Sequence, residues 1–296
     1  MASAAPTPLP YDGIEPDRIQ RLGQPHEQIG YFHDHESNQT RYRFNSLGFR
    51  SDEFDPSATH QVFAFGDSHT FGVGLDYATC WPVRFVAHWR AERGLEPAAV
   101  CLQNLADPGA SNAGIARAVV TQCHAVRPDL AVVMFAPFRR TEGMAQAAPF
   151  PIGWWTIARS AAERGEGGDR ASGGVAEERR ARARAYFDFA NDEACVLETL
   201  RSILLVQYYC HAMKVRLVAA CDGIWKLKQV VAGTPALATL WSQVNRRVLC
   251  DFDLWSTPGR STATAAERSR DGAHAGAGQH DVFAQDLLRF ANANQR

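Results

Sequence analysis

A serine behind an apolar run, and an aspartate–histidine pair near the carboxyl end of the chain, are the residues best suited to chemistry. Ser68 lies in F-G-D-S-H, directly after the run Gln61–Phe65, and Asp271 and His274 lie in D-G-A-H. A serine hydroxyl is a weak nucleophile unless a base takes its proton, and an acid group that holds the base orients it. The sequence therefore predicts Ser68 as nucleophile, His274 as base and Asp271 as the group that orients the base.

The loop that carries the acid and the base is rich in glycine and alanine. Such a loop turns tightly enough for the Asp271 carboxylate to accept a hydrogen bond from one ring nitrogen of His274. The other ring nitrogen then faces Ser68, and Asp271 fixes the tautomer and stabilises the imidazolium. We expect activity to fall on acidification, because a protonated His274 cannot accept the Ser68 proton.

Acyl transfer also needs hydrogen-bond donors for the charge that develops on the carbonyl oxygen. The backbone N–H groups of Ser68 and Gly109 are the first candidates, since each follows an expected strand. Side chains that are candidates for a further donor or for substrate binding are Asn112, Arg139 and Arg140.

Each of these residues also has an ordinary structural interpretation. Ser68 is a good helix cap, Asp271 precedes a glycine in a turn, and Gly109 follows a proline in another turn. We favour the catalytic interpretation because the serine motif and the D-x-x-H motif occur together. Asp67 is expected to be structural, with its carboxylate bound to backbone N–H groups of its loop.

Short apolar runs alternate with helical patterns, which predicts a parallel sheet covered by helices on both faces. The expected strands are Gln61–Phe65, Ala99–Leu105, Leu130–Phe135 and Val215–Ala219, with a further short strand around Val248–Leu254. Ligands gather at the carboxyl ends of the strands in such sheets, which is where Ser68 lies.

Five helices are expected between and after these strands. Proline near a helix start, a capping side chain and apolar residues at spacings of three and four mark them. The helices are expected to begin near Thr79–Pro82, at Asn112 as the cap, near Asp192, after Thr234-Pro235 and near Asp281. The third is expected to end near Met213, the fourth to extend through Val248 and the last to end near Ala293.

Two segments fall outside the alternation. Residues 1–58 are expected to form an N-terminal flap, with a hairpin over Tyr42–Phe54 around a turn at Asn45–Gly48, packed on a domain of residues 59–296. The stretch at about 139–190 is expected to be a flexible, lid-like insertion because it is long and contains E-R-G-E-G-G-D-R-A-S-G-G. Two interpretations stay open for Phe150, Trp154 and Trp155, which form either an acyl-binding wall or the packing of the insertion. The arginine-rich run that follows is interpreted as a solvated helix face.

Composition excludes several classes of protein. The 296 residues are 46% apolar and 21% charged, as in soluble globular chains, and the net charge of −1 argues against nucleic acid as a partner. No run is long enough to span a membrane, and no secretory signal is recognised at the start of the chain. The seven cysteines include no C-x-x-C pair, so reduced and mostly buried thiols are expected. His69, His124 and His280 lack metal-ligand spacing, so no metal is expected. Because neither a secretory signal nor a membrane span is recognised, a cytoplasmic location is expected.

In this order, the motifs resemble those of the SGNH or GDSL hydrolase family. G-D-S ends at Ser68, the second block has Gly109, and the last block is D-x-x-H; Y-R-F-N-S-L-G-F-R-S-D-E-F resembles the leader of many bacterial members. The resemblance implies a flavodoxin-like three-layer α/β/α sandwich with a mostly parallel sheet. It also implies hydrolysis of carboxylic esters by Ser68, His274 and Asp271 without a cofactor, on small-molecule or glycan esters, lipids or thioesters.

One block departs from the family pattern. Where G-x-N-D supplies an asparagine donor, this chain reads A-P-F-R, and Phe138 replaces the asparagine. Loss of one such donor typically lowers the rate about 10²- to 10³-fold. Three functions therefore stay open: an esterase acting through an acyl-enzyme, an acyltransferase with the same triad, and an inactive glycan- or acyl-binding module. Nucleotide binding is disfavoured, because Asp67 would repel a phosphate.

Overall fold

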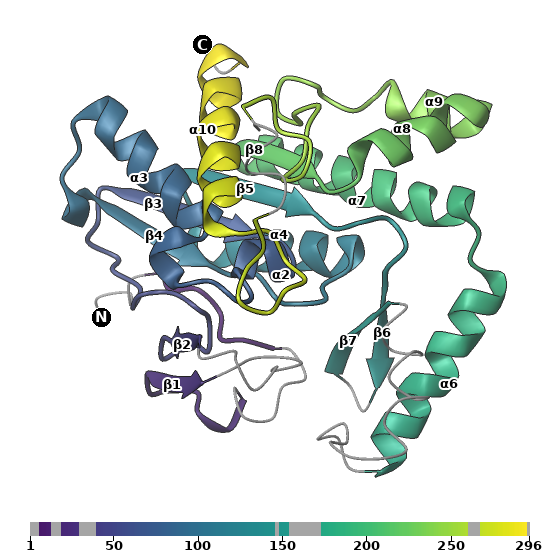
Figure 1. The fold of residues 1–296 in the computed structure, drawn as a ribbon, viewed down its shortest axis with the longest axis horizontal. Coiled ribbons are helices and arrows are strands. Elements are labelled where there is room, and N and C mark those ends of the chain that lie inside the picture. Colours follow the sequence, from purple (N-terminus) through teal and green to yellow (C-terminus); the bar gives the residue numbers. More distant parts are fainter. Residues whose placement is uncertain are drawn as a thin grey trace.

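A four-stranded parallel sheet forms the centre of the molecule (Figure 1). The computed structural model describes residues 6–12, 19–29, 40–145, 148–153, 173–259 and 267–294. The strand order is β4-β3-β5-β8, and the strands are β3 (His60–Phe65), β4 (Val100–Asn104), β5 (Leu130–Phe135) and β8 (Arg216–Cys221). All four were predicted to within two residues at each end. Their carboxyl ends share one edge of the sheet, as parallel pairing requires.

Helices cover both faces of this sheet, which confirms the predicted three-layer α/β sandwich. On one face lie α4 (Asn112–Val126), α7 (Asp192–Met213), α8 (Ile224–Gly233) and α9 (Pro235–Trp241). On the other lie α3 (Trp81–Arg93) and α10 (Ala277–Asn294). Short helices are α2 (Ser68–Phe71), η1 (Tyr77–Thr79) and η2 (Pro97–Ala99).

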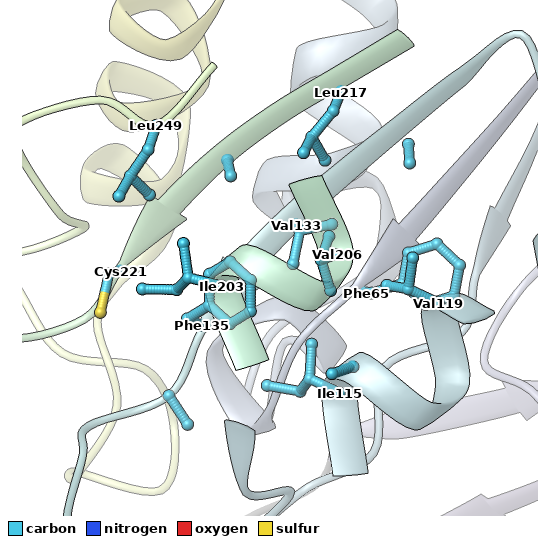
Figure 2. Packing of buried hydrophobic residues seen from close by; sticks show 14 of the residues in the cluster. Phe65, Ile115, Val119, Val133, Phe135, Ile203, Val206, Leu217, Cys221 and Leu249 are labelled. Carbon is cyan, nitrogen blue, oxygen red and sulfur yellow. The ribbon is translucent and has the colours of Figure 1, made fainter. Parts of the chain in front are cut away.

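The strands are apolar throughout because both of their faces are buried. All six residues of β5 are buried, and alternate residues contribute to different core clusters: Val133 packs with α4 and α7, whereas Val132 packs with α3 and α10. Figure 2 shows the first cluster, in which Phe65 and Val133 meet Ile115 and Val119 of α4. This packing fixes the sheet edge from which Ser68 projects.

Helix boundaries differ from the sequence prediction in three places. Ser111, not Asn112, caps α4, since its hydroxyl accepts from the Gly114 N–H at 3.1 Å. The helix after Thr234 ends at Trp241 instead of reaching Val248, and α8, which was not predicted, precedes it. The last helix begins at Ala277, four residues earlier than expected.

The expected strand around Val248–Leu254 is reduced to one bridge, between Ala219 of β8 and Leu249. The Ala219 N–H donates to the Val248 carbonyl at 2.7 Å, and the Cys250 N–H returns a bond to Ala219 at 2.9 Å. Beyond it the chain turns, because the Asp253 carboxylate accepts from the N–H groups of Trp255 and Ser256. The prediction of a strand here was wrong.

The predicted hairpin over Tyr42–Phe54 was also wrong. The turn forms, with the Asn45 N–H donating to the Phe49 carbonyl at 2.8 Å, but β2 (Arg41–Phe44) pairs with β1 (His26–Ile29) instead of with the residues after the turn. Those residues bind the core: Ser51 Oγ donates to the Leu102 carbonyl at 2.9 Å. Their polar groups are satisfied by the domain, so no second strand is needed.

The insertion contains regular structure where it is described. β6 (Thr141–Ala145) and β7 (Ala148–Ile152) form an antiparallel pair, followed by α6 (Gly173–Phe189). Phe150 is 1% exposed and packs with Ile152 and Ala183, which favours its packing role. Trp154, Trp155 and most of the glycine-rich stretch lie outside the described residues.

The seven cysteines are all buried and unpaired, as predicted. Within the described ranges, no helix is long and apolar enough to cross a membrane.

Candidate active site

Ser68 is the first residue of α2, at the carboxyl end of β3. Asp67 caps the helix by accepting from the His69 N–H at 3.0 Å, which confirms the structural role predicted for it. Gly66 lets the turn close, because a Cβ there would lie 2.0 Å from Thr70 Oγ1 and 3.0 Å from the Met134 carbonyl oxygen. The geometry of this turn directs the Ser68 hydroxyl towards the C-terminal loop.

The loop before α10 brings the base and the acid to that hydroxyl. His274 Nε2 lies 2.8 Å from Ser68 Oγ, and His274 Nδ1 is hydrogen-bonded to Asp271 Oδ2. Asp271 thus holds the ring with its Nδ1 protonated, and Nε2 is left to accept the serine proton. Residues separated by 206 positions meet as the sequence motifs predict.

The loop itself fixes the orientation of Asp271. Its Oδ1 accepts from Ser269 Oγ at 2.5 Å and from the N–H groups of Ala273 and His274 at 2.9 and 3.0 Å. Burial opposes ionisation, but the hydrogen bond and charge of His274, with the Ser269 hydroxyl, outweigh it and hold the pKa of Asp271 below its ordinary value. Asp271 is therefore ionised across the mildly acidic and neutral range.

A close contact joins the acid loop to the chain that follows the nucleophile. The Arg270 N–H donates to the Gly74 carbonyl at 3.1 Å, and the Arg270 guanidinium forms a bidentate ion pair with Asp76 at 2.7 and 2.8 Å. Gly74 has φ of +76°, and a Cβ there would lie 2.5 Å from Ser269 Oγ and 3.0 Å from the Asp271 nitrogen. This position has no room for a side chain.

Gly74→Ala is therefore expected to lower kcat at least about tenfold and to destabilise the fold by more than the roughly 1 kcal/mol that a left-handed alanine costs. Gly94→Ala is the matched control, because Gly94 also has a positive φ, of +61°, but nothing lies within 4 Å of its Cβ position. Urea unfolding of both variants, and their turnover of the esters that the sequence predicts as substrates, measure the difference. Equal losses in the two variants would show that the contact with the acid loop has no effect.

The two backbone donors predicted for the oxyanion lie on adjoining loops. The Asp107 N–H donates to the Gly66 carbonyl at 3.1 Å, which brings the loop after β4 against the turn before Ser68. Gly109 adopts φ of +86° in that loop. No acceptor among the described residues binds the N–H of Ser68 or of Gly109. Both groups can therefore serve an incoming carbonyl oxygen.

Asn112 is engaged elsewhere. Its Nδ2 donates to the Ala136 carbonyl at 3.0 Å and to Thr199 Oγ1 at 2.9 Å, and its Oδ1 accepts from the Ala136 N–H at 2.7 Å. The side chain ties α4 to the end of β5 and to α7. It has no donor left for an oxyanion, so its predicted role in the site is not supported.

Arg139 and Arg140 point to different surroundings. Arg139 pairs with Asp192 at 2.6 Å and is 67% exposed, away from the nucleophile. The Arg140 side chain is 14% exposed; its Nη1 lies 2.6 Å from Asp67 Oδ2 and 3.4 Å from the Ala110 carbonyl. Of the two, Arg140 is the one beside the serine turn and the Gly109 loop.

This ion pair controls the charge next to Ser68. Burial disfavours the charged form of Asp67, but the charge of Arg140 and the hydrogen bonds from the His69 N–H and the Arg140 guanidinium outweigh it, so the pKa of Asp67 is lowered. Phe138, which stands where the family has asparagine, is 7% exposed and belongs to the core. Arg140, two residues later in the chain, places a positive charge against Asp67 in the serine turn.

Arg50 is a positioning residue that the sequence analysis did not identify. Its fully buried guanidinium donates to the carbonyls of Phe71, Gly72 and Leu75 at 2.9, 2.6 and 2.5 Å, and it lies over the Tyr42 ring at 4.5 Å. These carbonyls end α2 and begin the next turn. The resemblance of Y-R-F-N-S-L-G-F-R to a family leader was a signal of its importance, but not of its role.

No family model and no curated protein matches this chain. Similar solved structures include TesA, 12% identical over 79% of this chain and 98% of its own, with a TM-score of 0.44. The psychrotrophic esterase EstA from Pseudoalteromonas sp. is 10% identical over 79% and 97%, with a TM-score of 0.45. A structure from Desulfitobacterium hafniense, described as a lipolytic protein of the G-D-S-L family, is 9% identical over 78% and 99%, with a TM-score of 0.40.

Proposed function

We propose that this protein is a serine hydrolase that cleaves carboxylic esters through an acyl-enzyme on Ser68. The observation that carries the proposal is the hydrogen-bonded series from Ser68 Oγ to His274 Nε2, at 2.8 Å, and from His274 Nδ1 to Asp271. A hydroxyl, an imidazole and an ionised carboxylate in this order form the arrangement that activates a serine.

In the first step, His274 Nε2 takes the proton from Ser68 Oγ as the oxygen attacks the ester carbonyl. The charge that develops on the carbonyl oxygen is bound by the N–H groups of Ser68 and Gly109, and Asp271 stabilises the imidazolium. The carbon–oxygen bond to the alcohol then breaks. His274 gives its proton to the leaving alkoxide, so an alcohol departs and the acyl group stays on Ser68.

The second step repeats the chemistry with water in place of the serine. His274 takes a proton from water, which attacks the acyl carbonyl, and the ester bond to Ser68 breaks. His274 returns the proton to Ser68 Oγ, and the carboxylic acid leaves. General acid–base assistance of this kind contributes about 10²- to 10⁴-fold to the rate.

Intact-mass spectrometry after incubation with a fluorophosphonate probe tests the proposal. The wild type is expected to gain one probe mass, while Ser68→Ala and His274→Ala remain unlabelled because the nucleophile or its base is missing. Ser57→Ala is the matched control, since Ser57 is an exposed serine bound to Asp55. An unlabelled wild type with an intact fold would overturn the proposal, as would equal labelling of Ser68→Ala.

A further inference from the structure

A second carboxyl and imidazole lie beside the triad and take no part in the steps above. Asp222 directly follows β8, and His69 directly follows Ser68 in α2. His69 Nε2 is 3.9 Å from Asp222 Oδ2. The His69 ring meets the His274 ring with centroids 5.0 Å apart and the Trp255 ring at 5.5 Å. Asp222 is thus separated from the catalytic base by one aromatic ring.

One ring nitrogen of His69 is buried without a hydrogen-bond partner among the described residues. The residue is 8% exposed, and its Nδ1 makes no hydrogen bond within the part of the chain that the structure describes. The 3.9 Å separation between Nε2 and Asp222 is also too long for a hydrogen bond. Keeping a buried imidazole without partners is unfavourable, and such groups in native proteins call for an explanation. Burial lowers the pKa of His69 to about 4, so the ring is neutral.

The Asp222 carboxyl has the properties of a binding group for neutral hydroxyls. The backbone N–H of Gly223 donates to it, no hydrogen bond from a side chain reaches it in the described ranges, and its side chain keeps 11% of its surface exposed. Burial, with the charges of Asp67 and Asp253, raises the pKa of Asp222 to about 7. At neutral pH it therefore exists in both protonation states, and it can donate to a hydroxyl as well as accept from one.

The order of strands places this pair on the leaving-group side of the site. In β4-β3-β5-β8, the Gly109 loop follows β4 on one side of β3, and Asp222 follows β8 on the other side. The carbonyl oxygen is drawn towards the Gly109 loop. The departing alcohol must receive its proton from His274, whose ring touches His69.

We propose that Asp222 and His69 bind a hydroxyl on the alcohol part of the ester, so that the preferred substrates are esters of polyols or sugars. The inference rests on the proposed function, whose alcohol it specifies.

Hydrolysis of two matched esters tests the proposal: glycerol monoacetate and propyl acetate, which has the same three-carbon chain without the two free hydroxyls. For the wild type, kcat/KM is expected to be at least about tenfold higher for glycerol monoacetate, because a site built around a hydroxyl rejects an analogue that lacks it. Asp222→Leu is expected to bring the ratio of kcat/KM for glycerol monoacetate to kcat/KM for propyl acetate close to one. Asp222→Asn, whose side chain can still donate and accept, is expected to keep most of the preference for glycerol monoacetate.

Two further variants complete the experiment. His69→Phe keeps a ring against His274 and Trp255 without its nitrogens, and it is expected to lower the ratio even if Asp222→Leu does not fold. Asp251→Asn is the control, because Asp251 is an exposed carboxylate paired with Arg246 and Lys228, and its ratio should equal that of the wild type.

The fluorophosphonate labelling rate separates the possible failures. The polyol inference alone is overturned if the enzyme is labelled but Asp222→Leu and His69→Phe keep the wild-type ratio of kcat/KM between the two esters. It is also overturned if these variants lose kcat/KM equally on both esters. A folded wild type that is neither labelled nor active on either ester overturns the proposed function and the inference with it.

Discussion

Asp271→Asn is expected to lower kcat for ester hydrolysis about 10⁴-fold while the fold is retained. In the wild type, Asp271 Oδ1 accepts from the N–H groups of Ala273 and His274, and the amide oxygen of an asparagine can still accept from both. The amide nitrogen, however, would donate to His274 Nδ1 and so place the ring proton on Nε2. A ring with a proton on Nε2 cannot accept one from Ser68.

Steady-state kinetics and thermal unfolding of Asp271→Asn measure the two effects. The control is Asp281→Asn, because Asp281 Oδ1 also contacts a histidine, His88 Nε2 at 2.9 Å, on the surface away from Ser68. It should leave kcat within about twofold of the wild type. A loss of less than about tenfold in Asp271→Asn would mean that the carboxylate does not control the tautomer.

The pH profile gives a second readout of the same arrangement. Because its contacts hold the pKa of Asp271 below the ordinary value, Asp271 stays ionised as the pH falls through the mildly acidic range. Protonation of Asp271 therefore does not account for the fall in activity on acidification that the sequence predicts.

The sequence brings out the proposed catalytic residues because their signals are local. Ser68 directly follows an apolar strand, and Asp271 and His274 lie three residues apart, so a short loop fixes their relation. The sheet was predictable for a related reason, since buried parallel strands are continuous apolar runs. β5 is the clearest example, with all six of its residues buried.

The supporting residues were not predictable, because their roles depend on where the chain folds back. Asn112 reads as a helix cap, yet Ser111 makes the cap and Asn112 crosses to Ala136 at the end of β5. Arg50 belongs to no motif with a stated role, and only the fold shows that it is fully buried among the carbonyls around α2. Asp222 has no motif, and only the strand order brings it to the site.

The adjacent arginines show the same limit, since the sequence gives no reason to separate Arg139 from Arg140. Arg140→Gln is expected to destabilise the fold by about 3–5 kcal/mol, because it leaves the Asp67 carboxylate, which is fully buried, without its cation. It is also expected to lower kcat by about 10-fold or more, because an unpaired negative charge beside Ser68 opposes the oxyanion. Urea unfolding and ester hydrolysis measure both.

Two comparisons make the Arg140 prediction specific. Arg139→Gln should lower the free energy of unfolding by no more than about 1 kcal/mol, because the ion pair of Arg139 with Asp192 is largely exposed.

The double variant Asp67→Asn with Arg140→Gln should recover most of the stability, since an asparagine side chain at position 67 can still accept from the His69 N–H without a buried charge. Recovery of stability without recovery of kcat would assign the Arg140 charge to the reaction itself. Equal stability of Arg140→Gln and Arg139→Gln would instead show that the buried pair does not hold the serine turn.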